Sequence, residues 1–147
     1  MAANASSVAL PQYTIDALAA NTAVRAAVEH AASLGASVNV AVVDRAGVLI
    51  AFLRMPGAFV HSIDIAIDKA YTAASFGLPT GQWHEALQSH SAAVREGIVR
   101  RPRFVGFGGG LPIVVNDQRI GGIGVSGGSE EQDDAIAQAG LDALLNF

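Results

Sequence analysis

The stretch Val38–Gly57, VNVAVVDRAGVLIAFLRMPG, carries the strongest fold signal in this chain. Two apolar, β-branched runs, Val38–Asp44 and Val48–Leu53, flank a short turn that contains Gly47. Strand-forming runs separated by a few turn residues predict an antiparallel β-hairpin. Met55-Pro56-Gly57 interrupts the second run. The sequence therefore predicts two paired strands in this region.

Apolar residues at helical spacing flank the hairpin on both sides. Before it, we expect Thr14 to cap a helix that runs to Leu34, where Gly35 provides a C-terminal stop. After it, Ser62 is the expected cap of a second helix, which Gly77 ends. Shorter helical segments are then expected to begin at Pro79-Thr80 and Ser91.

The C-terminal part predicts a second hairpin followed by a helix. Asn116-Asp117 lies between the apolar runs Leu111–Val115 and Ile120–Val125, which is typical of a hairpin turn. Ser129 and Gln132 have the spacing of a capping box, so a helix should start there. The order of elements has no regular βαβ alternation. We therefore expect an α+β protein with a largely antiparallel sheet.

Length and composition indicate one domain that works as an oligomer. With 147 residues the chain has the size of a single domain, and we expect a flexible arm at 1–12 followed by one domain at 13–147. Hydrophobic residues make up 51% and charged residues only 15%, against about 25% charged in typical globular proteins. So few charges leave much apolar surface, which sister subunits in a homo-oligomer would cover.

Several classes of function are disfavoured. The net charge of −4 argues against a general nucleic-acid-binding protein. The chain has no cysteine, and its four histidines show no recognised metal-binding spacing, so we predict no metal site. No apolar run approaches the roughly 20 residues that span a membrane, and the N-terminus lacks the basic and apolar regions of a secretory signal. We therefore expect no membrane partner and a cytoplasmic location.

Four blocks of sequence, in order along the chain, resemble the GlcG/HbpS-like family of the haem-degrading-domain superfamily. They are the hairpin Asn39–Val48 with Ala51–Ala58, the helix SIDIAIDKAYTAASFG at Ser62–Gly77, FGGGLPI at Phe107–Ile113, and GGIGVSGGSEEQD at Gly121–Asp133. The resemblance implies a five-stranded, mainly antiparallel sheet with helices on both faces, a profilin-like α/β/α sandwich. It also implies assembly as dimers to octamers.

The family resemblance implies a fold more firmly than an activity. Similar proteins include haem-binding proteins, the C-terminal domain of PduO-type corrinoid adenosyltransferases, companions of glycolate oxidation and hydroxylaminobenzoate lyases. Haem is thus a possible cofactor, and His30 on the first helix matches the location of a haem axial ligand in some relatives. The resemblance also implies that the helix with Tyr71 and Thr72 lines a ligand cleft.

Three residues on or next to that helix are candidate catalytic groups. Lys69, the only lysine, could lose its proton against apolar surface, although an ordinary ion-paired side chain is the competing interpretation. Asp64 lies four residues before Asp68, and repulsion between two close carboxylates can raise the pKa of one of them. His61 could act as a general base near neutral pH.

Arginines and glycines supply candidate ligand-binding groups. Arg101 belongs to a basic cluster that could clamp a carboxylate or pair with acids of a neighbouring subunit, and Arg54 could do the same alone. Gly108, Gly109 and Gly110 would let a ligand approach the backbone closely, or would form a bulge between strands. The cluster comprises Arg95, Arg100, Arg101 and Arg103.

The pattern Gly124-Val-Ser-Gly-Gly128 matches a nucleophile elbow, but no histidine follows it, and a tight strand-to-helix turn is the better interpretation.

Three functions remain open. The chain could be a small-ligand-binding protein for haem or a small organic acid. It could be a cofactor-independent lyase or isomerase acting on a small, for example hydroxylaminobenzoate-like, carboxylic acid. It could also be a non-catalytic accessory assembly protein.

Overall fold

Four antiparallel strands form the centre of the computed structural model, which describes residues 5–147. Their order across the sheet is β2-β1-β4-β3, so β2 and β3 are the edges. The strands are β1 (Asn39–Asp44), β2 (Leu49–Arg54), β3 (Gly110–Val115) and β4 (Gln118–Ser126). The α+β class and the antiparallel sheet are confirmed, as are both hairpins.

The expectation of five strands is wrong for the described residues. The apolar segment before β3 makes other contacts instead of pairing with a strand. The backbone amide of Val105 donates to Thr72 Oγ1 at 3.1 Å, and the Phe104 ring packs edge-on against the rings of Phe76 and Trp83. These contacts hold the segment against helix α3 rather than beside a strand.

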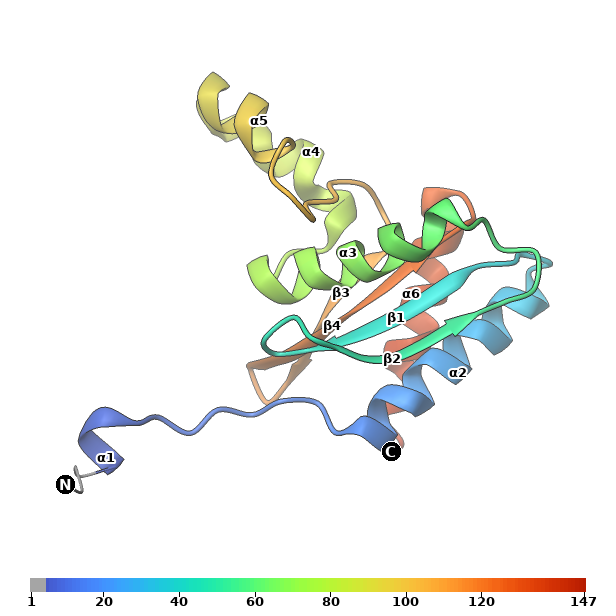
Figure 1. The fold of residues 1–147 in the computed structure, drawn as a ribbon, viewed down its shortest axis with the longest axis horizontal. Coiled ribbons are helices and arrows are strands. Elements are labelled where there is room, and N and C mark those ends of the chain that lie inside the picture. Colours follow the sequence, from blue (N-terminus) through green and yellow to red (C-terminus); the bar gives the residue numbers. More distant parts are fainter. Residues whose placement is uncertain (1–4) are drawn as a thin grey trace.

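Helices cover both faces of the sheet, as expected (Figure 1). One face carries α3 (His61–Phe76), and the other carries α2 (Ala17–Ser33) and α6 (Glu130–Leu144). Small residues let α3 lie close to the sheet. A Cβ atom added at Gly124 would be 2.1 Å from the carbonyl oxygen of Ala66, so β4 tolerates no side chain there.

Two expected helix caps are wrong. The α2 helix begins after Asp16, whose carboxylate accepts hydrogen bonds from the amides of Leu18 and Ala19. Thr14 instead accepts a hydrogen bond from the amide of Arg45. The α3 helix starts at His61 without a side-chain cap, because its N-cap position is Val60 rather than Ser62.

The other local signals are confirmed. Ser91 caps α5 (Ala92–Ile98), and Ser129 forms the capping box of α6 with Gln132. Gly35 and Gly77 follow their helices with φ of 71°. The hairpin turn at Asn116 and Asp117 has positive φ at both residues, as a tight two-residue turn requires.

An excursion between α3 and β3 projects from the sheet (Figure 1). Trp83 anchors its base, with ring centroids 4.8 Å from Phe76 and 4.9 Å from Phe104. Helix α5, farther out, has no buried residue. The excursion also contains η1 (Thr80–Gln82), α4 (Trp83–Ala86) and η2 (Leu87–Ser89).

At the N-terminus, α1 (Ala5–Val8) and an extended segment lead to α2 (Figure 1). This segment joins the sheet where the amide of Ile15 donates to the carbonyl oxygen of Ile120. In the part of the chain that the structure describes, no helix is both long and apolar enough to cross a bilayer.

Candidate functional site

A cleft of about 240 Å³ lies between the C-terminal half of α3 and the segment 98–104. We call it the α3 cleft. Helical spacing puts its α3 residues on one side of that helix, because positions three and four apart are neighbours. The lining residues are Tyr71, Thr72, Ser75, Phe76, Ile98, Arg101, Pro102, Arg103 and Phe104.

Arg103 is held firmly at one side of the α3 cleft. Its Nε donates to Asp68 Oδ1 at 2.9 Å, and its guanidinium lies 3.6 Å from the centroid of the Tyr71 ring. Its backbone has a φ of 67°, which is unusual for a residue other than glycine. Thr72 Oγ1 lies 3.0 Å from the Arg103 carbonyl oxygen and supports that conformation. The Arg103 side chain is therefore fixed in place.

Arg101 is different. Its side chain is exposed at the α3 cleft and makes no hydrogen bond or ion pair with the described residues. The aromatic wall beside it consists of Phe76 and Phe104, whose ring centroids are 6.2 Å apart. An unpaired guanidinium next to aromatic rings suits a ligand that carries a carboxylate on a flat apolar skeleton.

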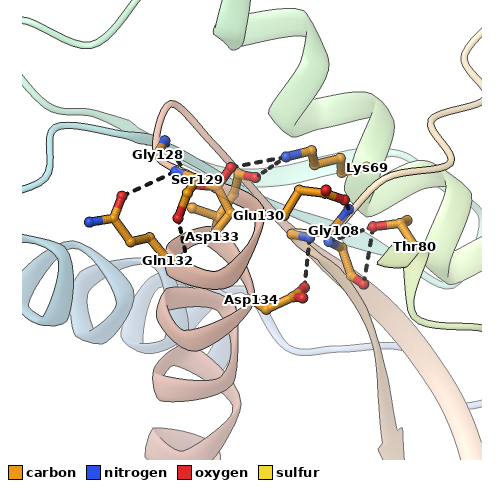
Figure 2. A network of polar contacts seen from close by, with 12 residues as sticks. Lys69, Thr80, Gly108, Gly128, Ser129, Glu130, Gln132, Asp133 and Asp134 are labelled. Carbon is orange, nitrogen blue, oxygen red and sulfur yellow. Dashed lines mark hydrogen bonds and ion pairs between the residues drawn. The ribbon is translucent and has the colours of Figure 1, made fainter. Parts of the chain in front are cut away.

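A second polar region joins α3 to the start of α6 (Figure 2). Lys69 Nζ donates to the carbonyl oxygen of Val125 at 2.8 Å and to Asp133 Oδ2 at 3.1 Å. The two side chains are only 1% and 3% exposed. Nζ also lies 5.0 Å from the centroid of the Phe107 ring. Lys69 is thus an enclosed, ion-paired side chain.

Burial governs the titration of this pair. It lowers the pKa of Lys69 from 10.5, while the charge of Asp133 and its hydrogen bond act in the opposite direction. It also raises the pKa of Asp133 from 3.8, against the charge of Lys69 and the backbone amides of Gly128 and Gly127. Each partner therefore loses more by leaving water than it gains from its neighbours.

The glycine triplet is engaged by the protein itself (Figure 2). The amide of Gly108 donates to Glu130 Oε1, and that of Gly109 to Asp134 Oδ1, both at 2.7 Å. The amide of Gly110 donates to Thr80 Oγ1 at 2.8 Å. Neighbouring atoms also leave no room for a side chain at these positions. A Cβ atom at Gly109 would lie 2.4 Å from the carbonyl oxygen of Val125.

The structure brings together some of the residues that the sequence singled out and separates others. Tyr71, Thr72 and Arg101 meet in the α3 cleft. The three candidate catalytic residues do not meet, since Lys69 is buried while His61 and Asp64 are exposed.

Two other candidates lie elsewhere. Arg54 is on the edge strand β2, where its Nη2 donates to the carbonyl oxygen of Ala58 at 2.7 Å. His30 is on α2, across the sheet from α3. Among the described residues, no group of three or more His, Asp or Glu side chains could hold a metal ion.

Sequence reasoning missed the pairing of Asp68 with Arg103 and of Lys69 with Asp133. Each pair joins residues at least 35 positions apart, and no local spacing connects them. The aromatic wall at Phe76 and Phe104 was also missed as part of a site. Its only signal was the apolar character of each residue.

Several known proteins are similar to this chain in sequence. A family model described as haem degrading protein HbpS-like matches residues 15–142. An uncharacterized 15.0 kDa protein from the dhaT-dhaS intergenic region of Citrobacter freundii is 38% identical over 131 residues, covering 89% of this chain and 92% of that protein. The corrinoid adenosyltransferase PduO of Salmonella typhimurium is 38% identical over 120 residues, or 82% of this chain. Those residues span only 36% of PduO.

Solved structures show the same fold. The crystal structure of Klebsiella pneumoniae protein ORFY superposes with a TM-score of 0.87 at 36% identity, covering 95% of this chain and 96% of that one. The crystal structure of a PduOC:haem complex superposes with a TM-score of 0.80 at 35% identity. It covers 88% of this chain and 94% of PduOC.

Proposed function

We propose that this chain, which belongs to the HbpS-like family, binds a small carboxylate with a flat apolar skeleton in the α3 cleft. The observation that carries the proposal is the unpaired guanidinium of Arg101 beside aromatic walls. Arginine binds carboxylates with paired, directional hydrogen bonds. A ring stacked on the wall and a carboxylate on Arg101 would satisfy both features of the cleft.

The size of the α3 cleft supports a small ligand. Its volume of about 240 Å³ is below the range of about 300–1,000 Å³ that is usual for drug-sized ligands. Its ionisable lining residues are Tyr71 and two arginines, while His61, Asp64 and Lys69 are not among them. These features support binding without turnover, rather than the lyase or isomerase considered from the sequence.

Haem is a second candidate ligand, favoured by the likeness to the PduOC:haem complex. The α3 cleft is small for a whole haem, and no histidine lines it. Tyrosine can also ligate haem iron, but the ring of Tyr71 is covered by the guanidinium of Arg103. The haem candidate therefore rests on a histidine outside the cleft. His30 on α2 is the one that we propose to test.

The single tryptophan offers a direct readout of the α3 cleft. Trp83 contacts Phe76 and Phe104, both of which line the cleft. We expect benzoate to change the fluorescence of Trp83 in a saturable manner. Arg101→Leu should weaken benzoate binding roughly tenfold, since a hydrogen bond to a charged group contributes about 1.5 kcal/mol or more.

Arg100→Leu is the matched control, because it removes the same charge at the neighbouring position, and Arg100 does not line the cleft. It should retain benzoate binding. Equal losses in the two variants, or no saturable response in the unchanged protein, would contradict the proposal.

In a separate titration with hemin, a sharp Soret band that His30→Ala abolishes would support haem. A Soret band that survives His30→Ala would remove that histidine as axial ligand.

A further inference from the structure

We infer that the α3 cleft selects a monoanion, because Asp68 neutralises Arg103 and leaves Arg101 as the single uncompensated charge among the residues that line the cleft. The inference rests on the proposed function and adds to it the charge class of the ligand. Asp68 then acts as a residue that determines specificity without belonging to the lining of the cleft.

The charges at the cleft can be counted from contacts. Arg101 and Arg103 contribute two positive charges. Asp68 contributes one negative charge, 2.9 Å from the Nε of Arg103. None of the other lining residues is a lysine, arginine, aspartate or glutamate, so they add nothing to the formal charge. The balance is therefore one positive charge, which matches one carboxylate.

The position of Asp68 follows from the register of α3. It precedes Thr72 by four residues and Tyr71 by three, so it lies one helical turn away on the same side of the helix. Arg103 is fixed to it from the opposite wall by the ion pair, the Tyr71 ring and the Thr72 hydroxyl. A second carboxylate on the ligand would meet Arg103 only in competition with Asp68.

Because Arg103 and Asp68 are partly buried, this competition should affect the affinity for a dianion. The side chains of Arg103 and Asp68 are 41% and 26% exposed, so water screens their charges only in part. A dianion would place one carboxylate near Arg101 and another near Asp68. The second contact is a like-charge pair, which disfavours binding.

The experiment compares two ligands of similar size and different charge, phthalate and monomethyl phthalate, by the fluorescence of Trp83 at low ionic strength. Unchanged protein should bind the monoanion more tightly than the dianion. Asp68→Asn keeps the oxygen that accepts from Arg103 Nε but removes the charge. It should raise the affinity for phthalate about threefold relative to monomethyl phthalate, as expected for a partly exposed charge.

Glu96→Gln on α5 is the matched control, since it makes the same change in net charge at an exposed residue that does not line the cleft. It should leave the ratio of the two affinities unchanged. A ratio that is the same in Asp68→Asn and in the unchanged protein would overturn the inference while leaving the proposed function intact. Failure of the unchanged protein to bind benzoate or either phthalate would overturn both.

A second variant guards against misfolding of the first. Arg103→Gln makes the cleft neutral overall, so the preference for benzoate over its neutral isostere benzamide should fall about threefold. A general loss of structure would weaken both ligands together, and circular dichroism would detect it. An unchanged ratio of benzoate to benzamide affinity in folded Arg103→Gln would overturn the inference.

Discussion

Lys69 and Asp133 show how burial shapes chemistry at the scale of single residues. Both are enclosed, and for both the cost of leaving water outweighs the mutual attraction. The pair is therefore poor evidence for extra stability. Replacing either residue by a neutral one should nevertheless destabilise the fold, because the partner would be left as an unpaired buried charge.

Asp133→Asn should destabilise the protein by about 3 kcal/mol at pH 7, because it leaves the Lys69 ammonium without its counter-charge. The pH dependence has a definite sign. Burial already lowers the pKa of Lys69 below 10.5, and loss of the Asp133 charge lowers it further. Between that lowered pKa and 10.5 the unfolded chain binds more protons than the folded one, so stability rises with pH.

Urea denaturation at neutral and at alkaline pH measures this effect. The stability deficit of Asp133→Asn should be smaller at alkaline pH. Glu131→Gln, an exposed position in the same helical turn, should change stability little at either pH. A deficit of constant size across the pH range would mean that Lys69 does not lose its proton in the variant.

Gly109 and Gly97 allow a test of how the surroundings of a glycine decide the effect of a Gly→Ala substitution on stability. Gly109 has a φ of 124°, and an added Cβ would contact the carbonyl oxygen of Val125 and Lys69 Nζ at 2.4 and 2.7 Å. Gly109→Ala should therefore cost about 3 kcal/mol. Gly97 lies in α5 with nothing within 4 Å of an added Cβ, so Gly97→Ala should stabilise by about 0.5 kcal/mol. Thermal unfolding would show opposite shifts, and equal shifts would contradict this account.

At the scale of elements, prediction succeeded where the signal was local. The capping box at Ser129, the turn at Asn116-Asp117 and the first hairpin each depend on residues a few positions apart. It failed where tertiary contacts decide. Thr14 has the chemistry of a helix cap, yet it bonds to Arg45 across the fold. The segment before β3 packs on aromatic rings and does not add a fifth strand.

The candidate site, too, could be predicted from the sequence only in part. Tyr71 and Thr72 could be assigned to a cleft because the resemblance marked their helix, and Arg101 because basic residues cluster near it. The partnership of Asp68 with Arg103 could not be predicted, since the two residues are 35 positions apart and meet only because the excursion returns to α3. The positive φ of Arg103 could not be predicted from the sequence either.

Helix α5 should be much less protected than α3. It has seven residues and buries none of them, whereas α3 buries seven. Helices this short are marginal without packing, and local opening is easiest where few apolar contacts hold an element. Hydrogen exchange followed by mass spectrometry should find rapid exchange over residues 92–98 and slow exchange over 61–76. Comparable protection of the two helices would indicate that α5 is covered in solution.

At the scale of the whole molecule, both edge strands of the sheet expose apolar side chains to solvent. On β2 and its preceding turn, Val48, Leu49, Ile50 and Leu53 are between 37% and 58% exposed. Edge strands of this kind readily pair with another chain unless charges or bulges prevent it. Together with the low content of charged residues, this edge is the part of the surface that we expect a second copy to cover.

Light scattering after gel filtration would test that expectation. The unchanged protein should run as an oligomer at micromolar concentration, and Leu53→Lys on the β2 edge should shift it toward the monomer, because a buried unpaired charge is costly at an interface. Val114→Lys on the opposite edge, β3, is the matched control and should leave the oligomer intact. If Val114→Lys dissociates the oligomer and Leu53→Lys does not, copies associate through β3 instead. If the unchanged protein is a monomer, its apolar edges are stable in water, and the composition argument for an oligomer is wrong.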